Sequence, residues 1–140
     1  MPIEYSIEHE RRLVWAAGQG VLTDADIVGY QREVWSRCDV AGYDEVLDMS
    51  VVDRIALPPA GRVQQLAVLA ASMAAAPSRL AIVAAQDLAF GLGRMYEAHR
   101  HLSEKGSTHV RVVRTVADAL IFLGLPANYA APDKKVGKLD

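Results

Sequence analysis

The chain has 140 residues, of which 51% are hydrophobic and 23% charged, and its formal net charge is −2. This balance predicts one folded domain with a real core and excludes a disordered chain. The small net charge gives no general attraction to nucleic acid or to anionic membranes. Residues 66–76 form the longest apolar stretch, which is shorter than the roughly 20 residues of a membrane span, and no signal peptide is visible. Cys38 is the only cysteine, so no internal disulfide can form and a reducing cytoplasm is the expected location.

The N-terminal residues predict a β-hairpin. Residues 3–8 alternate apolar and polar side chains, which is the period of a half-buried strand. After a polar turn, Leu13 to Ala17 predict a second strand, which is ended by Gly18 and Gly20.

A helix is predicted from Asp24 to Arg37. Thr23 is a good N-cap with Asp26 three residues later, and acidic side chains suit the first turn. Glu33 and Arg37 are spaced to form an exposed pair. Cys38 falls on the apolar stripe of this helix, where we expect a buried, inert thiol.

From residue 45 onward, strands and helices alternate. Pro59 suits a first helical turn, Asp87 and Thr115 are caps, and Gly124 is a stop signal. Strands are predicted over residues 45–50, 79–85 and 109–114, and helices over residues 59–75, 87–104 and 116–123. The resulting order, ββαβαβαβα, predicts an α/β domain with a mainly parallel sheet of four to five strands and an antiparallel hairpin strand at its edge.

We expect residues 1–125 to form a single domain and residues 126–140 to form a mobile C-terminal tail. The tail has few large apolar residues and carries Lys134, Lys135 and Lys138. The alternative is that this segment docks on the domain through Tyr129.

The stretch from Val46 to Leu66 resembles the core of the STAS domain, the fold of the anti-sigma-factor antagonists. In that family a strand ending in Leu-Asp-Leu-Ser leads to Ile-Asp-Ser-Ser-Gly at the start of the second helix. Residues 47–50 (Leu-Asp-Met-Ser) and Ile55 match this pattern, whereas residues 56–59 (Ala-Leu-Pro-Pro) do not.

The chain as a whole is similar to the bacterial SpoIIAA-like group, which is linked by fold with the lipid-binding Sec14/CRAL-TRIO proteins. Residues 87–96 (Asp-Leu-Ala-Phe-Gly-Leu-Gly-Arg-Met-Tyr) carry this resemblance. It implies a SpoIIAA/STAS-like architecture and no agreed biochemical function, because a fold hosts many functions.

The departure at residues 56–59 has a chemical consequence. STAS regulators of the anti-sigma type are switched by phosphorylation of a serine at this helix start, whereas Leu57, Pro58 and Pro59 carry no hydroxyl. We therefore predict that the chain is not a phosphorylation switch of this kind. Labelling of residues 55–62 by a cognate kinase would contradict that prediction.

Polar residues follow the third predicted strand, at the edge where parallel sheets bind ligands. The candidate ligand or partner contacts are Asp48, Ser50, Asp53, Arg54, Pro58 and Arg94. The simpler interpretation is that Ser50 and Asp53 satisfy backbone groups of a turn.

Other patterns carry little chemistry. Gly91 and Gly93 lack the third glycine of a dinucleotide fingerprint and are expected to allow close packing or a kink. Glu97 and His101 are two side chains at helical spacing, which is too few for a zinc site. We predict no catalytic residue, no metal and no cofactor.

The sequence leaves three functions open. We favour a non-catalytic module that binds a protein partner or its own copy, most simply as a homodimer. The alternative is a carrier or sensor of a small apolar ligand, which the Sec14-like resemblance implies and which needs a cavity of about 300–1,000 Å³. An enzyme is the least favoured, because it would need Asp48, Ser50, Asp53 and Arg94 to converge. Nucleic acid and a membrane span are not expected.

Overall fold

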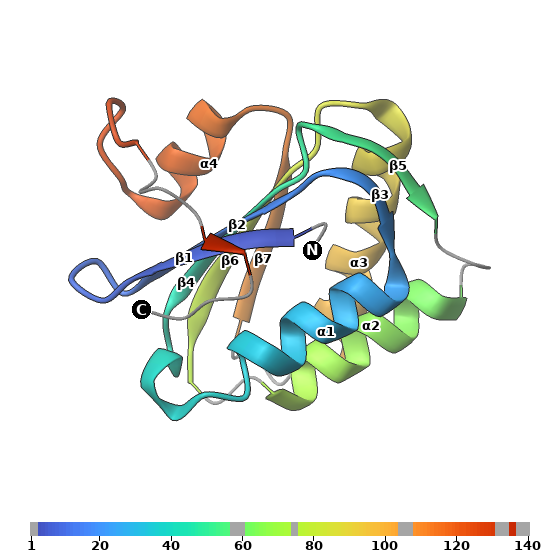
Figure 1. Ribbon diagram of the computed structural model, residues 1–140, viewed down its shortest axis with the longest axis horizontal. Coiled ribbons are helices and arrows are strands. Elements are labelled where there is room, and N and C mark those ends of the chain that lie inside the picture. Colours follow the sequence, from blue (N-terminus) through green and yellow to red (C-terminus); the bar gives the residue numbers. More distant parts are fainter. Residues whose placement is uncertain (1–2, 57–60, 74–75, 104–107, 131–134, 137–140) are drawn as a thin grey trace.

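The computed structural model describes residues 3–56, 61–73, 76–103, 108–130 and 135–136, which form an α/β fold (Figure 1). Every strand and helix predicted from the sequence is present. The strands are β1 (Ile3–Glu8), β2 (Leu13–Gly18), β3 (Gly20–Thr23), β4 (Asp44–Asp48), β5 (Val52–Ala56), β6 (Ser78–Val83), β7 (Thr108–Val113) and β8 (Lys135–Val136). The helices are α1 (Asp24–Val34), α2 (Gly61–Met73), α3 (Asp87–Ser103) and α4 (Val116–Leu123), with a 3₁₀ turn at Cys38–Val40.

The main sheet is mixed, as predicted. Its strand order is β7-β6-β4-β2-β1-β8. Strands β2, β4, β6 and β7 are parallel neighbours, and β1 forms the antiparallel hairpin with β2. Strand β8 adds two residues beside β1 and was not predicted, since so short a pairing leaves no periodic signal.

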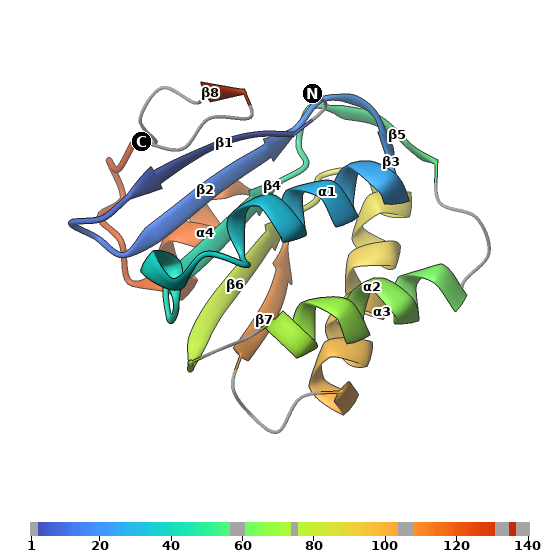
Figure 2. The same cartoon turned by 60° about the horizontal axis from the view of Figure 1, so that its bottom comes forward.

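Helices cover both faces of this sheet. Along β4, Val46 packs with α4, whereas Leu47 packs on the opposite face with residues of β1, α1 and α3. Helices α1, α2 and α3 lie together on that second face, where α2 contacts both other helices (Figure 2). Central strand β6 likewise buries Ala81 and Val83 on one face and Leu80 and Ile82 on the other, which is why its sequence reads as a continuous apolar run.

A second, two-stranded sheet was missed. Strands β3 and β5 pair in parallel where the sequence indicated only a polar crossing and the end of a hairpin. The end of β2 also lies close to β5, because a Cβ atom added to Gly18 would lie 2.8 Å from a methyl carbon of Val52. Gly20 has a φ of +61°, which turns the chain from β2 into β3.

Helix α1 is shorter than predicted. Its capping box between Thr23 and Asp26 is confirmed, but the helix ends at Val34 because Arg37 is already extended. Arg37 therefore pairs with Asp39, at 2.8 Å from Nε to Oδ1, and the predicted Glu33–Arg37 pair does not form. Cys38 is exposed rather than buried, because it begins the 3₁₀ turn instead of continuing the helix.

Residues 126–130 follow the docked alternative. The Tyr129 ring stacks on Trp15 with 5.8 Å between centroids, and its hydroxyl donates to a Glu8 carboxylate oxygen at 2.9 Å. The rest of the predicted tail lies outside the described residues apart from β8. Of the helices that the structure describes, none has the length and hydropathy needed to cross a membrane.

Candidate functional site

Two of the predicted contact residues interact at the carboxyl end of β4. Asp48 Oδ1 accepts hydrogen bonds from the Ser50 backbone N–H at 2.9 Å and from the Ser50 hydroxyl at 2.6 Å. The turn itself was expected, but the side chain that accepts its backbone N–H is Asp48, not Ser50 or Asp53 as the simpler interpretation had it. Ser50 is exposed, and its hydroxyl donates a hydrogen bond to Asp48.

The other predicted residues are spread over separate elements. Asp53 and Arg54 are exposed on β5, and Arg94 is exposed on α3. Pro58 lies outside the described residues. The structure therefore brings together Asp48 and Ser50, whereas Asp53, Arg54 and Arg94 are exposed on other elements.

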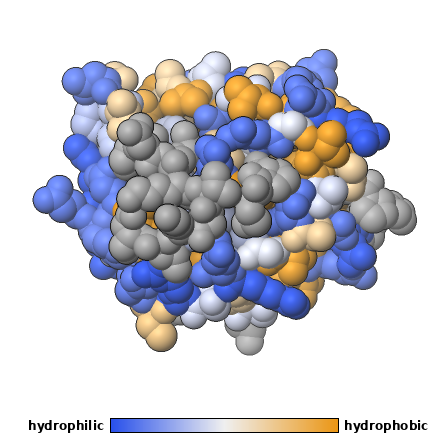
Figure 3. Space-filling model, viewed as in Figure 1, coloured by the Kyte–Doolittle hydropathy of each residue, from blue (hydrophilic) through white to orange (hydrophobic). Residues whose placement is uncertain are grey.

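Large apolar side chains are exposed near this turn. Val51, directly after Ser50, is 62% exposed, and Leu88 in the first turn of α3 is 68% exposed. The Met49 N–H donates to the Val83 carbonyl at 2.8 Å and so holds the end of β4 beside the end of β6, which α3 follows along the chain. On the face seen in Figure 3, hydrophobic side chains form separate patches among hydrophilic ones, one of them over β3 and β5.

Arg114 binds residues at the start of α3 near this region. Arg114 donates to the Ala85 carbonyl at 3.0 Å and to an Asp87 carboxylate oxygen at 2.8 Å. Its guanidinium lies 4.0 Å from the centroid of the Phe90 ring. We call Val51 and Leu88, together with Asp53, Arg54, Asp87 and Arg114, the strand-end surface.

A second candidate site was missed by the sequence and lies at the opposite edge, where β4 begins. Glu45 is 7% exposed and accepts a hydrogen bond from the Tyr30 hydroxyl at 2.6 Å. Tyr30 in turn accepts from the Trp35 indole N–H at 3.3 Å. Tyr30 in α1 and Trp35 at its C-cap thus hold the Glu45 carboxyl inside the fold.

Burial controls the protonation of this pair. Desolvation raises the pKa of the Glu45 carboxyl, and the hydrogen bond from Tyr30 and the charge of Arg100 oppose that rise. Burial and the neighbouring Glu45 raise the pKa of the Tyr30 hydroxyl well above its ordinary value. The hydroxyl is therefore the donor in the bond between them.

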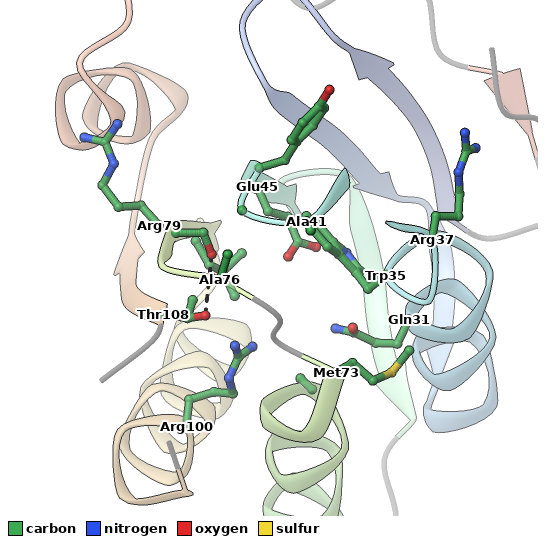
Figure 4. A pocket seen from close by; sticks show the side chains of 15 residues that line it. Gln31, Trp35, Arg37, Ala41, Glu45, Met73, Ala76, Arg79, Arg100 and Thr108 are labelled. Carbon is green, nitrogen blue, oxygen red and sulfur yellow. Dashed lines mark hydrogen bonds between the residues drawn. The ribbon is translucent and has the colours of Figure 1, made fainter. Parts of the chain in front are cut away.

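Two small cavities meet at Glu45. An apolar cavity of about 60 Å³ lies between the sheet and α1, α2 and α3, and a more polar cavity of about 50 Å³ lies beside Arg100 and Thr108. Gln31, Glu45 and Leu80 line both. Figure 4 shows the Gln31 amide, the Glu45 carboxyl and the Arg100 guanidinium pointing toward the same space.

A sequence signal for this site existed. Glu45 alternates with Val46 and shares a strand face with Leu47, so a carboxylate stands on a face that helices must cover. Acidic side chains are rarely buried without a partner, which makes such a position a candidate site. The partners Tyr30 and Gln31 are 14–15 residues away in sequence, and their approach to Glu45 depends on how α1 crosses the sheet.

Glu97 and His101 contact the backbone of β7. Within the part of the chain that the structure describes, no three His, Cys, Asp or Glu side chains form a group able to hold a metal ion. The strand-end surface and the Glu45 cavities are therefore the two candidate sites.

Comparison with protein-family models gives no match, and comparison with curated proteins gives none either. Among solved structures, the chain is similar to an uncharacterised DUF3478-family protein with a SpoIIAA-like fold from Shewanella loihica PV-4. The similarity covers 86% of this chain and 93% of that chain, with a TM-score of 0.56 and 17% sequence identity. The chain therefore has a SpoIIAA-like α/β fold, and this likeness carries no specific function.

Proposed function

We propose that this protein is a non-catalytic binding module that docks a protein through the strand-end surface, in the first instance a second copy of itself. The observation that carries the proposal is the exposure of Val51, directly after the Asp48–Ser50 turn, and of Leu88, in the first turn of α3 after β6. Large apolar side chains left in water favour association, because burying them releases free energy. A cytoplasmic location belongs to the same proposal.

The charges at this surface favour a second copy as the partner. The surface carries Asp53 next to Arg54, and Asp87 bound to Arg114. A twofold interface places the same patch on both subunits, so a patch with both signs of charge can complement itself. Arginine and aromatic side chains are both enriched at protein interfaces, and here Arg114 lies over the Phe90 ring.

Sedimentation velocity with matched leucine variants tests the proposal. Leu88 and Leu102 lie at opposite ends of α3 and are 68% and 83% exposed. We expect wild type and Leu102→Glu to form dimers with the same affinity. We expect Leu88→Glu and Val51→Glu to weaken the dimer by about tenfold or more, which corresponds to about 1.4 kcal/mol. A monomeric wild type, or equal weakening by Leu102→Glu, would contradict the proposal.

The apolar cavity favours a second candidate function, the binding of a small ligand. A carrier of lipid-sized molecules needs about 300–1,000 Å³, whereas this cavity is about 60 Å³. The second candidate is therefore limited to a ligand of a few atoms.

A further inference from the structure

The Glu45 cavities contain hydrogen-bonding groups that the fold leaves unused. Gln31 lines both cavities, and its side-chain amide makes no hydrogen bond to any residue that the structure describes, although it is not among the fully buried polar groups without a partner. Glu45 uses Oε2 for the Tyr30 hydroxyl, and the carboxyl faces both cavities. An amide that faces a cavity without a protein partner is able to hydrogen-bond a molecule placed there.

The apolar cavity provides the other half of a ligand site. Its walls come from β1, β4, β5 and β6 and from all three helices on this face, with Leu47, Ile82 and Leu92 among them. A body of a few carbon atoms would fit there, because an engineered cavity of about 150 Å³ holds benzene. The polar groups stand at one end of this apolar space, at Gln31 and Glu45.

The burial of the cavities favours an uncharged ligand. Glu45 and Arg100 carry opposite formal charges, and both are buried, at 7% and 4% exposure. Arg100 already bonds the Tyr96 hydroxyl at 3.1 Å. A charged ligand would lose its hydration on entering this buried space, and removing an ion from water costs several kcal/mol.

We propose that the Glu45 cavities bind a small uncharged molecule with a short apolar body and a terminal carboxamide-like group. The amide group of the ligand donates to the Glu45 carboxyl and accepts from the Gln31 amide N–H, while its apolar body lies among Leu47, Ile82 and Leu92. This inference rests on the second candidate function and is independent of dimer formation at the strand-end surface.

The two tryptophans make the test internal to the protein. Trp35 lines the polar cavity and bonds Tyr30, whereas Trp15 lies on the other face of the sheet against Tyr129. NMR spectra of the full chain report each indole N–H separately. Propionamide is the probe, and propionate and propylammonium carry the same short body with a negative or a positive charge. Titration reaches about 100 mM, because a probe of about five non-hydrogen atoms has limited affinity.

We expect propionamide to shift the Trp35 indole signal saturably and to leave the Trp15 signal in place. We expect propionate and propylammonium to bind at least about tenfold more weakly, a difference of about 1.4 kcal/mol. Equal binding of either ion overturns the proposal. A titration in which no Trp35 shift saturates also overturns it, because the cavities then hold only water.

Variants locate the ligand. Gln31→Met keeps the length of the side chain and removes the amide, and we expect it to weaken propionamide binding by about tenfold or more. Gln64→Met, at an exposed position of α2, is the matched control and should bind as wild type does. Ala89→Val, which narrows the apolar cavity, should also weaken binding and serves if Gln31→Met does not fold. Undiminished binding by both cavity variants overturns the assignment, and either result leaves the dimer test unaffected.

Discussion

Glu97 on α3 accepts a hydrogen bond from the backbone N–H of Val112 at 3.2 Å, on the outer edge of β7. His101, one turn further along the helix, accepts from the Val110 N–H at 3.2 Å in the same way. Strand β7 is an edge strand, and its unpaired N–H groups would otherwise be open to another chain. Two side chains that the sequence suggested only as a helical pair thus cover the edge of the sheet.

Removing these acceptors should destabilise the edge. We expect Glu97→Ala to lower the free energy of unfolding by about 1 kcal/mol, and the double change with His101→Ala to increase self-association by strand pairing. Glu97→Gln is the control, since its amide oxygen still accepts. Urea denaturation and light scattering measure both effects. Equal stability of the Ala and Gln variants would show that the N–H group finds another acceptor.

The two glycines of α3 should respond differently to alanine. A Cβ atom on Gly93 would lie 3.0 and 3.2 Å from the methyl carbons of the buried Val112, whereas a Cβ atom on Gly91 would meet nothing within 4 Å. Alanine favours a helix over glycine by about 0.5–1 kcal/mol. We therefore expect Gly91→Ala to stabilise the protein by that amount and Gly93→Ala to be at least about 1 kcal/mol less stable than Gly91→Ala. Thermal unfolding of the pair decides the matter, and equal stabilisation would contradict close packing at Gly93.

Glu45 should make stability depend on pH. Burial raises the pKa of its carboxyl from an ordinary value of 4.5, so the folded chain binds this proton more tightly than the unfolded chain does. Its contribution to the free energy of unfolding is present in full below 4.5 and is lost as the pH rises through the raised folded pKa. Glu45→Gln cannot lose a proton, so above pH 4.5 its stability should fall less than that of wild type.

Urea denaturation at a series of pH values compares the two chains. Glu10→Gln, at an exposed position, is the control and should follow wild type. Parallel curves for wild type and Glu45→Gln over this range would mean that Glu45 titrates alike in the folded and unfolded chains.

Tyr129 should stabilise the domain from outside the predicted core. Its ring stacks on Trp15 and its hydroxyl bonds Glu8, and burial followed by the interactions with Glu8 raises the pKa of Tyr129 to about 12. We expect Tyr129→Ala to lower the free energy of unfolding by about 1–3 kcal/mol. Tyr129→Phe keeps the stacking and should lose about 1 kcal/mol or less.

The Trp15 indole signal separates these two variants. It should move strongly in Tyr129→Ala and little in Tyr129→Phe, because ring stacking sets its environment. If Tyr129→Ala unfolds at the same urea concentration as wild type, residues 126–130 contribute nothing to stability.

The elements with strong local signals were predicted closely. Helix α4 begins and ends as expected, because Thr115 caps its first turn and Gly124 adopts the left-handed conformation that ends it. The end of α1 was wrong by three residues: the apolar spacing continues to Cys38, but the chain leaves the helix to enter β4. Strands β3 and β5 were missed since each is short and gains its pairing from a segment about 30 residues away.

The two candidate sites show the same contrast between local and long-range signals. The residues around Ser50 were predicted because parallel strands expose their carboxyl ends, and the local Asp48–Ser50 turn needs no distant partner. The Glu45 cavities were not predicted. Gln31 and Tyr30 meet Glu45 only when α1 crosses the beginning of β4.

By itself, the sequence determined the alternation of strands and helices, the hairpin and the absence of a hydroxyl at residues 57–59, because each depends on neighbouring residues alone. Tertiary structure alone decided which polar groups are buried. Desolvation depends on what packs over a side chain from every direction, and for Glu45 those neighbours come from α1, α3 and β6. In the sequence Glu45 is one of 17 acidic residues. In the fold it is a buried carboxyl with a raised pKa, where the two cavities meet.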